Sequence, residues 1–77
     1  MEIKEFIKNF AEQLDDTDAS ALSPETNFRD LDDWSSLAAL GVLGMVDEEY
    51  DVQLKGNEMR STNTIQELFD LVVSKLD

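Results

Sequence analysis

The strongest constraint on the fold is a set of apolar residues near the N-terminus that repeats with the period of an α-helix. Its members fall at i, i+3, i+4, i+7, i+8 and i+11: Ile3, Phe6, Ile7, Phe10, Ala11 and Leu14. This spacing places these side chains on one face of a helix. We therefore predict an amphipathic helix from about Glu2 to about Asp15.

Two further segments carry helical signals. A second helix is predicted from near Ser36 to near Tyr50. Its expected core face comprises Ala39, Val42, Leu43, Val46 and Tyr50, opposite Leu37, Gly41, Gly44 and Glu48. Thr64 and Glu67 form a capping-box pattern that predicts the start of a last helix. Its expected buried stripe is Ile65, Leu68, Phe69, Val72 and Leu76. A short helical turn is expected around residues 57–60.

Residues 15–34 contain turn-forming residues and the only proline of the chain. This composition predicts a long structured loop, with a short turn of its own, anchored by Leu22, Phe28 and Leu31. The chain is therefore expected to be all-α: a four-helix bundle, three main helices plus one short, with a long loop between helices one and two. Residues 1–77 are expected to form a single domain.

The composition excludes several functions. Eighteen Asp and Glu residues face six Lys and Arg, for a formal net charge of −12. Such a surface disfavours nucleic acid and anionic membranes as partners and favours basic protein patches. The alternative reading of this acidity is solubility alone. The chain has no histidine and no cysteine, which excludes Ser-His-Asp catalysis, disulfides and thiolate metal sites. We expect no catalytic residues and no metal.

No segment of the sequence resembles a targeting or membrane signal. The N-terminal stretch MEIKEFIKNF alternates charged with apolar residues, unlike a signal peptide. The apolar run from Leu37 to Val46 is too short to cross a bilayer and contains two glycines. We expect a cytoplasmic, monomeric protein.

Two adjacent serines precede the second predicted helix. Serine is a preferred N-cap, and only one residue can cap a given helix. If Ser35 is the cap, Ser36 is the first helical residue and its side chain is exposed. The Ser36 hydroxyl has no base beside it and cannot activate itself as a nucleophile. Ser36 is therefore either polar filler or an attachment point that another enzyme modifies.

Several motifs along the chain together resemble an acyl carrier protein. They are Asp30-Leu31, Ser36-Leu37, the acidic segment 47–51 and the capping box 64–67, and the resemblance covers essentially the whole chain. It implies that a separate phosphopantetheinyl transferase joins 4′-phosphopantetheine to Ser36. It also implies a non-catalytic carrier of thioester-bound acyl groups in fatty-acid or related polyketide-like biosynthesis. Ser35 stands where the family usually has aspartate, and it retains a capping oxygen.

The resemblance also implies partners and a place for the acyl chain. Acyl-transferring and chain-elongating enzymes are expected to dock through basic patches onto Leu37, Asp32, Asp33, Asp47, Glu48 and Trp34. Family members usually carry further acids on the outward side of helix two, where this chain has Ala38, Gly41 and Gly44. Partners are therefore expected to rely more on apolar contact around Leu37. The acyl chain is expected between the helices, at Phe28, Leu43, Val46, Ile65 and Phe69, which are equally suited to core packing.

Some alternatives remain open from the sequence. Trp34 is either a partner anchor or a cover for the apolar residues of the loop. The carrier is either an acyl carrier or a peptidyl or aminoacyl carrier, although it lacks the glycine pair that peptidyl carriers usually have before the serine motif. A different class of function is an acidic helical interaction module whose serine stays unmodified.

Overall fold

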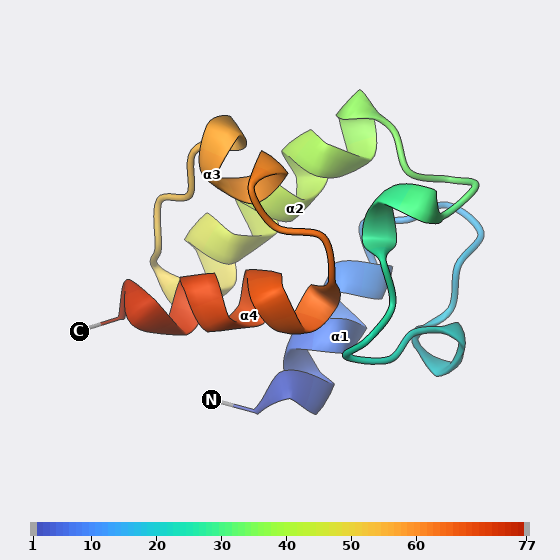
Figure 1. Ribbon diagram of the computed structural model, residues 1–77, viewed down its shortest axis with the longest axis horizontal. Helices are drawn as coiled ribbons and strands as arrows, with labels where there is room; N and C mark the ends of the chain where they lie inside the picture. Colours follow the sequence, from blue (N-terminus) through green and yellow to red (C-terminus); the bar gives the residue numbers. More distant parts are fainter. Residues whose placement is uncertain (1, 77) are drawn as a thin grey trace.

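The computed structural model describes residues 2–76, and within this range the chain forms helices and no β-strand. The elements are α1 (Ile3–Ala11), the 3₁₀ helices η1 (Ala19–Ala21) and η2 (Phe28–Asp30), α2 (Ser36–Tyr50), α3 (Gly56–Arg60) and α4 (Ile65–Ser74). Figure 1 shows the four α-helices gathered together, while the long connection between α1 and α2 runs along one side of them. The predicted all-α bundle with three main helices and one short helix is confirmed.

Helix α1 ends at Ala11, earlier than the periodicity predicts. The chain then continues as a 3₁₀-type turn, because the amides of Gln13 and Leu14 donate to the carbonyls three residues before them rather than four. Leu14 stays buried in this turn, so the apolar pattern continues past the end of the helix. The pattern therefore reports burial correctly but overestimates the helix length.

Helix α2 has the predicted bounds, and its core face shares Val42 and Val46 with the expected one. The buried residues on it are Ala38, Val42, Met45 and Val46. Ala38, expected on the outward side, is only 6% exposed. The expected face is therefore rotated from the real one toward Ala39 and Leu43, which are half-buried. Helix α2 is apolar around most of its circumference from Leu37 to Val46. The spacing of its apolar residues therefore does not identify which face is buried.

The core lies where α1, α2 and α4 meet. Its completely buried side chains are Phe6, Phe10, Val42, Val46, Ile65, Leu68 and Val72. Aromatic contacts join the elements: Phe6 meets Phe69 of α4 at a centroid distance of 5.4 Å, and Phe10 meets Phe28 of η2 at 5.6 Å. Burying each such side chain stabilises the fold by about 1.5–3 kcal/mol.

The loop of residues 12–35 is tied to the start of α4. The first-turn amides of a helix have no partner within the helix. In α4 two of them are satisfied by the loop, because Ile65 N donates to Thr26 O at 3.1 Å and Gln66 N donates to Pro24 O at 2.9 Å. Leu22 and Phe28 are buried and Leu31 packs partly against the core, which confirms the expected anchoring.

The capping box of α4 forms as predicted. Thr64 Oγ1 accepts from Glu67 N at 3.1 Å, and Glu67 Oε1 accepts from Thr64 N at 3.0 Å. Hydrogen bonds from the amides of Thr64 and Asn63 lower the pKa of Glu67. At the other end the expected stripe is wrong at Leu76, which follows the helix and is 45% exposed.

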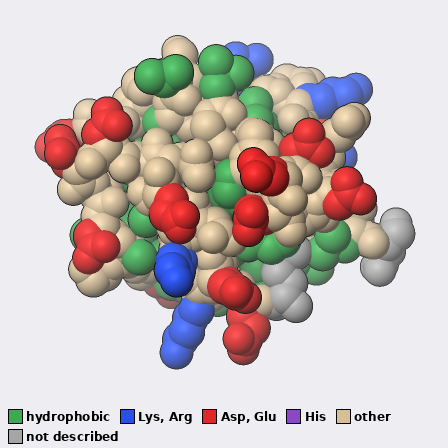
Figure 2. All heavy atoms as spheres, turned by 180° about the vertical axis from the view of Figure 1, so that it is seen from behind, with side chains coloured by type: hydrophobic (Ala, Val, Ile, Leu, Met, Phe, Trp, Pro, Cys, Tyr) green, Lys and Arg blue, Asp and Glu red, His purple; other side chains and the backbone are tan. Residues whose placement is uncertain are grey.

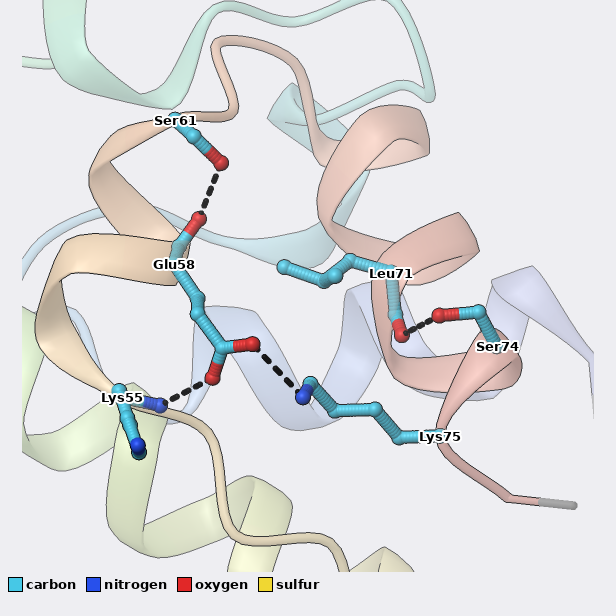
Figure 3. Close-up of polar contacts among 6 residues, drawn as sticks. All are labelled: Lys55, Glu58, Ser61, Leu71, Ser74 and Lys75. Carbon is cyan, nitrogen blue, oxygen red and sulfur yellow. Dashed lines mark hydrogen bonds and ion pairs between the residues drawn. The ribbon is translucent and has the colours of Figure 1, made fainter.

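The short helix α3 is joined to the end of α4 by a charged contact (Figure 3). Lys75 Nζ lies 2.7 Å from Glu58 Oε2, while Glu58 Oε1 accepts from Lys55 N at 3.0 Å. The Lys75 ammonium, and then the Lys55 amide, lower the pKa of Glu58. Glu58 thus caps α3 and also ties it to α4.

Candidate functional site

The two adjacent serines have different positions at the start of α2. Ser35 has extended backbone angles, and its Oγ accepts from Ala38 N at 3.2 Å. This is an N-cap, as predicted. Ser36 is the first residue of the helix and is exposed. Within residues 2–76 no side-chain hydrogen bond engages its Oγ, and the first turn of α2 contains no acidic residue. Ser36 therefore presents its hydroxyl to solvent beside the positive end of a helix dipole.

The residues before the cap fix the start of α2 in place. Trp34 is half-buried; its indole stacks on Phe10, with centroids 5.8 Å apart and 3° between the ring planes. It also meets Phe28 edge-on at 4.9 Å. Of the two readings of Trp34, covering the apolar residues of the loop is therefore the one that these contacts support.

Asp33 is fixed by hydrogen bonds to the other end of the loop. Its Oδ2 accepts from Asp16 N at 2.9 Å, and its Oδ1 accepts from Thr17 Oγ1 at 2.8 Å. The Asp16 amide and then the Thr17 hydroxyl lower the pKa of Asp33. Asp33 thus closes the loop on itself, whereas its neighbour Asp32 is exposed.

A groove of about 450 Å³ opens directly beside Ser36. One wall is a single face of α2, formed by residues at i, i+3, i+4 and i+7: Ser36, Ala39, Leu40 and Leu43. The remaining walls come from η2, the cap region and α3: Phe28, Arg29, Trp34, Ser35, Gly56, Met59 and Arg60. Most of the uncharged lining is apolar, so the groove suits a chain that is largely hydrophobic.

The structure separates the residues predicted for an acyl pocket. Phe28 and Leu43 line the groove. Val46 and Ile65 are completely buried in the core, and Phe69 packs against Phe6. The last three are therefore placed among the core residues and do not line the groove beside Ser36.

Of the residues predicted for partner docking, Asp33 and Trp34 are half-buried and engaged within the molecule, and the others are exposed. Leu37 is 78% exposed on the outward face of α2, and Leu40, which the sequence reasoning did not single out, is 66% exposed beside it. Asp47 and Glu48 are exposed toward the other end of the helix. Figure 2 shows Asp and Glu side chains spread over the face of the molecule opposite to the view of Figure 1.

Of the two glycines of α2, only one faces open space. A Cβ at Gly44 would meet nothing within 4 Å, but a Cβ at Gly41 would lie 3.0 Å from Gln13 Oε1. Gly41 therefore faces the turn after α1, while Gly44 leaves the backbone accessible from outside. The outward face that partners can reach is thus narrower than the sequence predicted, because it includes neither Ala38 nor Gly41.

Sequence reasoning missed four groove residues that come from outside α2, although it had predicted Phe28 of η2 for the acyl pocket. Arg29, Arg60, Met59 and Gly56 come from η2 and α3, which are separated by some 25 residues and meet only in the folded chain. No local pattern joins them. The spacing of residues 36, 39, 40 and 43 on one helical face was the available signal for the opposite wall.

Residues 2–76 contain no group of three acidic side chains arranged to hold a metal ion. In the same range no helix combines the length and the apolar character needed to cross a membrane.

The fold and this serine define a small helical domain that presents a hydroxyl group at the start of its second main helix. In comparisons with known proteins, the family of the phosphopantetheine attachment site matches residues 5–72. Searches of curated proteins and of solved structures gave no match. The chain belongs to the phosphopantetheine attachment site family, since the match spans most of its length. This confirms the family resemblance that the motifs indicated.

Membership fixes the general role of the domain. Domains of this family are carriers, generally non-catalytic, that bear covalent 4′-phosphopantetheine and interact with a phosphopantetheinyl transferase and partner enzymes. The residues present fit this group. Ser36 is exposed, the first turn of α2 favours an anion, and a largely apolar groove lies beside the hydroxyl.

Proposed function

We propose that this protein is an acyl carrier protein that holds acyl intermediates as thioesters on a 4′-phosphopantetheine arm joined to Ser36 Oγ. The observation that carries this proposal is the position of Ser36: it is exposed, it opens α2, and it lines the groove. The arm supplies a thiol, which the chain itself lacks because it has no cysteine.

The assignment to Ser36 rather than Ser35 rests on how each side chain is used. Ser35 Oγ already accepts from Ala38 N, and modifying it would remove the cap of α2. Ser36 Oγ has no such role, so a bulky group there leaves the helix intact. Its phosphodiester would lie beside first-turn amides that lack helical partners.

The preference for acyl groups rests on the lining of the groove. Ala39, Leu40, Leu43 and Met59 offer apolar surface to an aliphatic chain. An aliphatic chain that enters the groove buries apolar surface, and this burial favours binding by about 25 cal/mol per Å². This argues for fatty-acid or related polyketide-like biosynthesis over aminoacyl cargo.

The acidic surface and the exposed leucines suit transient docking. Charge steers the carrier toward basic patches on acyl-transferring and chain-elongating enzymes, while Leu37 and Leu40 supply apolar contact. Asp32, Asp47 and Glu48 are exposed for this role. Asp33 and Trp34 are engaged within the molecule, and we assign them to supporting the site.

The test uses purified protein, coenzyme A and a phosphopantetheinyl transferase of broad specificity. The intact mass should rise by one phosphopantetheine in the native chain and in Ser35→Ala, and should stay unchanged in Ser36→Ala. The product is then offered acyl-loading and aminoacyl-loading enzymes. Faster loading of the aminoacyl group would favour a peptidyl carrier, and no mass gain at all would favour an unmodified interaction module.

A further inference from the structure

The groove beside Ser36 has a charge opposite to that of the whole molecule. The chain carries a net charge of −12 and has two arginines, Arg29 and Arg60. Both arginines line this groove, and none of the described residues that line it is Asp or Glu. In a chain with three times as many acids as bases, this is a local concentration of positive charge.

The two arginines come from different elements, and the guanidinium of Arg29 contacts the backbone of Arg60. One Nη of Arg29 donates to the carbonyl of Arg60, and the other donates to Asn63 Oδ1 at 3.3 Å. A guanidinium has five N–H donors, so most of those on Arg29 remain for another acceptor. The contact holds Arg29 of η2 beside Arg60 at the end of α3.

No carboxylate neutralises this pair within residues 2–76. The ion pair in that range joins Lys75 to Glu58, on the side of α3 that faces α4. Arginine binds phosphate and carboxylate groups by parallel hydrogen bonds. The groove therefore presents two arginines, free of carboxylate partners, in the same cavity as Ser36.

We propose that Arg29 and Arg60 form an anion site that binds the phosphodiester of the arm and so holds the arm in the groove. This proposal rests on attachment at Ser36. The phosphodiester is the anion that the observations favour, because it is bonded directly to a residue of the groove. The first-turn amides of α2 and the two arginines would both supply donors to this anion. This interaction, which we call the latch, is salt-sensitive and keeps the arm in the groove between encounters with partner enzymes.

The test compares modified protein, checked by mass, in four forms: native, Arg60→Gln, Arg29→Gln/Arg60→Gln and Lys4→Gln. Lys4 is the matched control, since it is an exposed cation on α1 and does not line the groove. The readouts are the ³¹P shift of the phosphodiester and nuclear Overhauser contacts between the arm's geminal methyls and the Met59 methyl. If loss of the Arg29 hydrogen bonds disturbs the fold, Arg29→Lys is used as a further variant, because it keeps the positive charge.

The native protein and Lys4→Gln should show the contacts at low ionic strength. The contacts should weaken in Arg60→Gln, vanish in the double variant, and vanish from the native protein at about 1 M salt, where the Debye length is about 3 Å. Contacts that survive in the double variant, or that are missing from native modified protein, would overturn the latch while leaving the attachment intact. A chain that gains no mass overturns both proposals.

One further experiment identifies which anion the two arginines bind. The modified protein is loaded with a dicarboxylic half-thioester and with a neutral acyl group of equal length. Contacts that depend on the arginines with both loads support the phosphodiester. If the contacts depend on the arginines only with the carboxylated load, the proposal is overturned. The two arginines would then bind the carboxylate of the acyl group instead.

Discussion

The indole of Trp34 stacks on the ring of Phe10, with 5.8 Å between centroids and 3° between planes. This contact joins the residue just before the cap of α2 to the C-terminal end of α1. Ser36 lies two residues further on. The hydroxyl that we propose as the attachment point is therefore held by the packing of the core and not by a free loop.

Replacing Trp34 should destabilise the whole domain. Trp34→Ala removes the stack on Phe10 and the edge contact with Phe28, and we expect it to lower the free energy of unfolding by about 2–3 kcal/mol. Trp34→Phe retains part of both contacts and should lose less than half as much. Urea unfolding measures each value. A change below about 0.5 kcal/mol in Trp34→Ala would show that the indole is available to partners instead.

The two serines should respond differently to the same substitution. Ser35→Ala removes the acceptor for Ala38 N and should cost about 1 kcal/mol of stability. Ser36→Ala removes no side-chain hydrogen bond within residues 2–76 and should change stability by less than about 0.5 kcal/mol. Ser35→Asp restores a capping oxygen and should stay close to the native value. Equal losses in Ser35→Ala and Ser36→Ala, measured by thermal unfolding, would contradict the division of roles.

Asp33 should make the stability of the domain depend on acid pH. Its pKa is lowered in the folded state by the Asp16 amide and the Thr17 hydroxyl. The folded state therefore binds this proton less readily than the unfolded chain does. The stabilisation is fully present above the unfolded pKa, about 3.9, and is lost as the pH falls through the folded value. Asp33→Asn should be less stable than the native chain at pH 7, and this difference should shrink in acid.

Asp32→Asn is the matched control for this measurement. It makes the same change of charge one residue away, at an exposed side chain. Removing one negative charge from a chain of net charge −12 relieves repulsion. Asp32→Asn should therefore leave stability at pH 7 unchanged or slightly higher. If both variants lose the same stability across the pH range, the hydrogen bonds of Asp33 are not the cause.

Partner enzymes should depend more on Leu37 than on the acids at the end of α2. Leu37 is 78% exposed, and burying such a side chain in an interface is worth about 1.5–3 kcal/mol. Leu37→Ala should therefore lower kcat/KM of the phosphopantetheinyl transferase by about tenfold or more. Glu48→Lys should have a smaller effect, which added salt reduces. A far larger loss in Glu48→Lys than in Leu37→Ala would reverse this ranking.

The parts of the fold that the sequence predicted are those with strong local signals. The capping box of Thr64 and Glu67, the cap at Ser35 and the bounds of α2 depend on neighbouring residues, and each forms as predicted. The end of α1 was misplaced because its apolar pattern continues through Leu14, which is buried in a turn that has already left the helix. Apolar spacing reports burial more directly than it reports hydrogen bonding.

The groove could be predicted only in part. The family resemblance pointed to Ser36, and Leu43 was among the residues expected at the acyl site. The opposite wall depends on η2 and α3 coming together, and no sequence pattern links Arg29 to Arg60. Val46 and Ile65 were expected at the acyl site because the family resemblance implies an acyl chain between the helices, and they were equally suited to core packing. Both are completely buried and neither lines the groove, so their role at an acyl site stays a prediction. The difference between a lining residue and a core residue is set by tertiary packing.

The most direct test of the central claim is to map the modified residue. The native chain is treated with coenzyme A and a phosphopantetheinyl transferase, and the peptide that contains both serines is fragmented in a mass spectrometer. Cleavage between Ser35 and Ser36 separates the two possibilities. We predict that every fragment containing Ser36 carries the phosphopantetheine mass and that fragments ending at Ser35 are unmodified. The mass on Ser35, or on neither serine, would contradict the account.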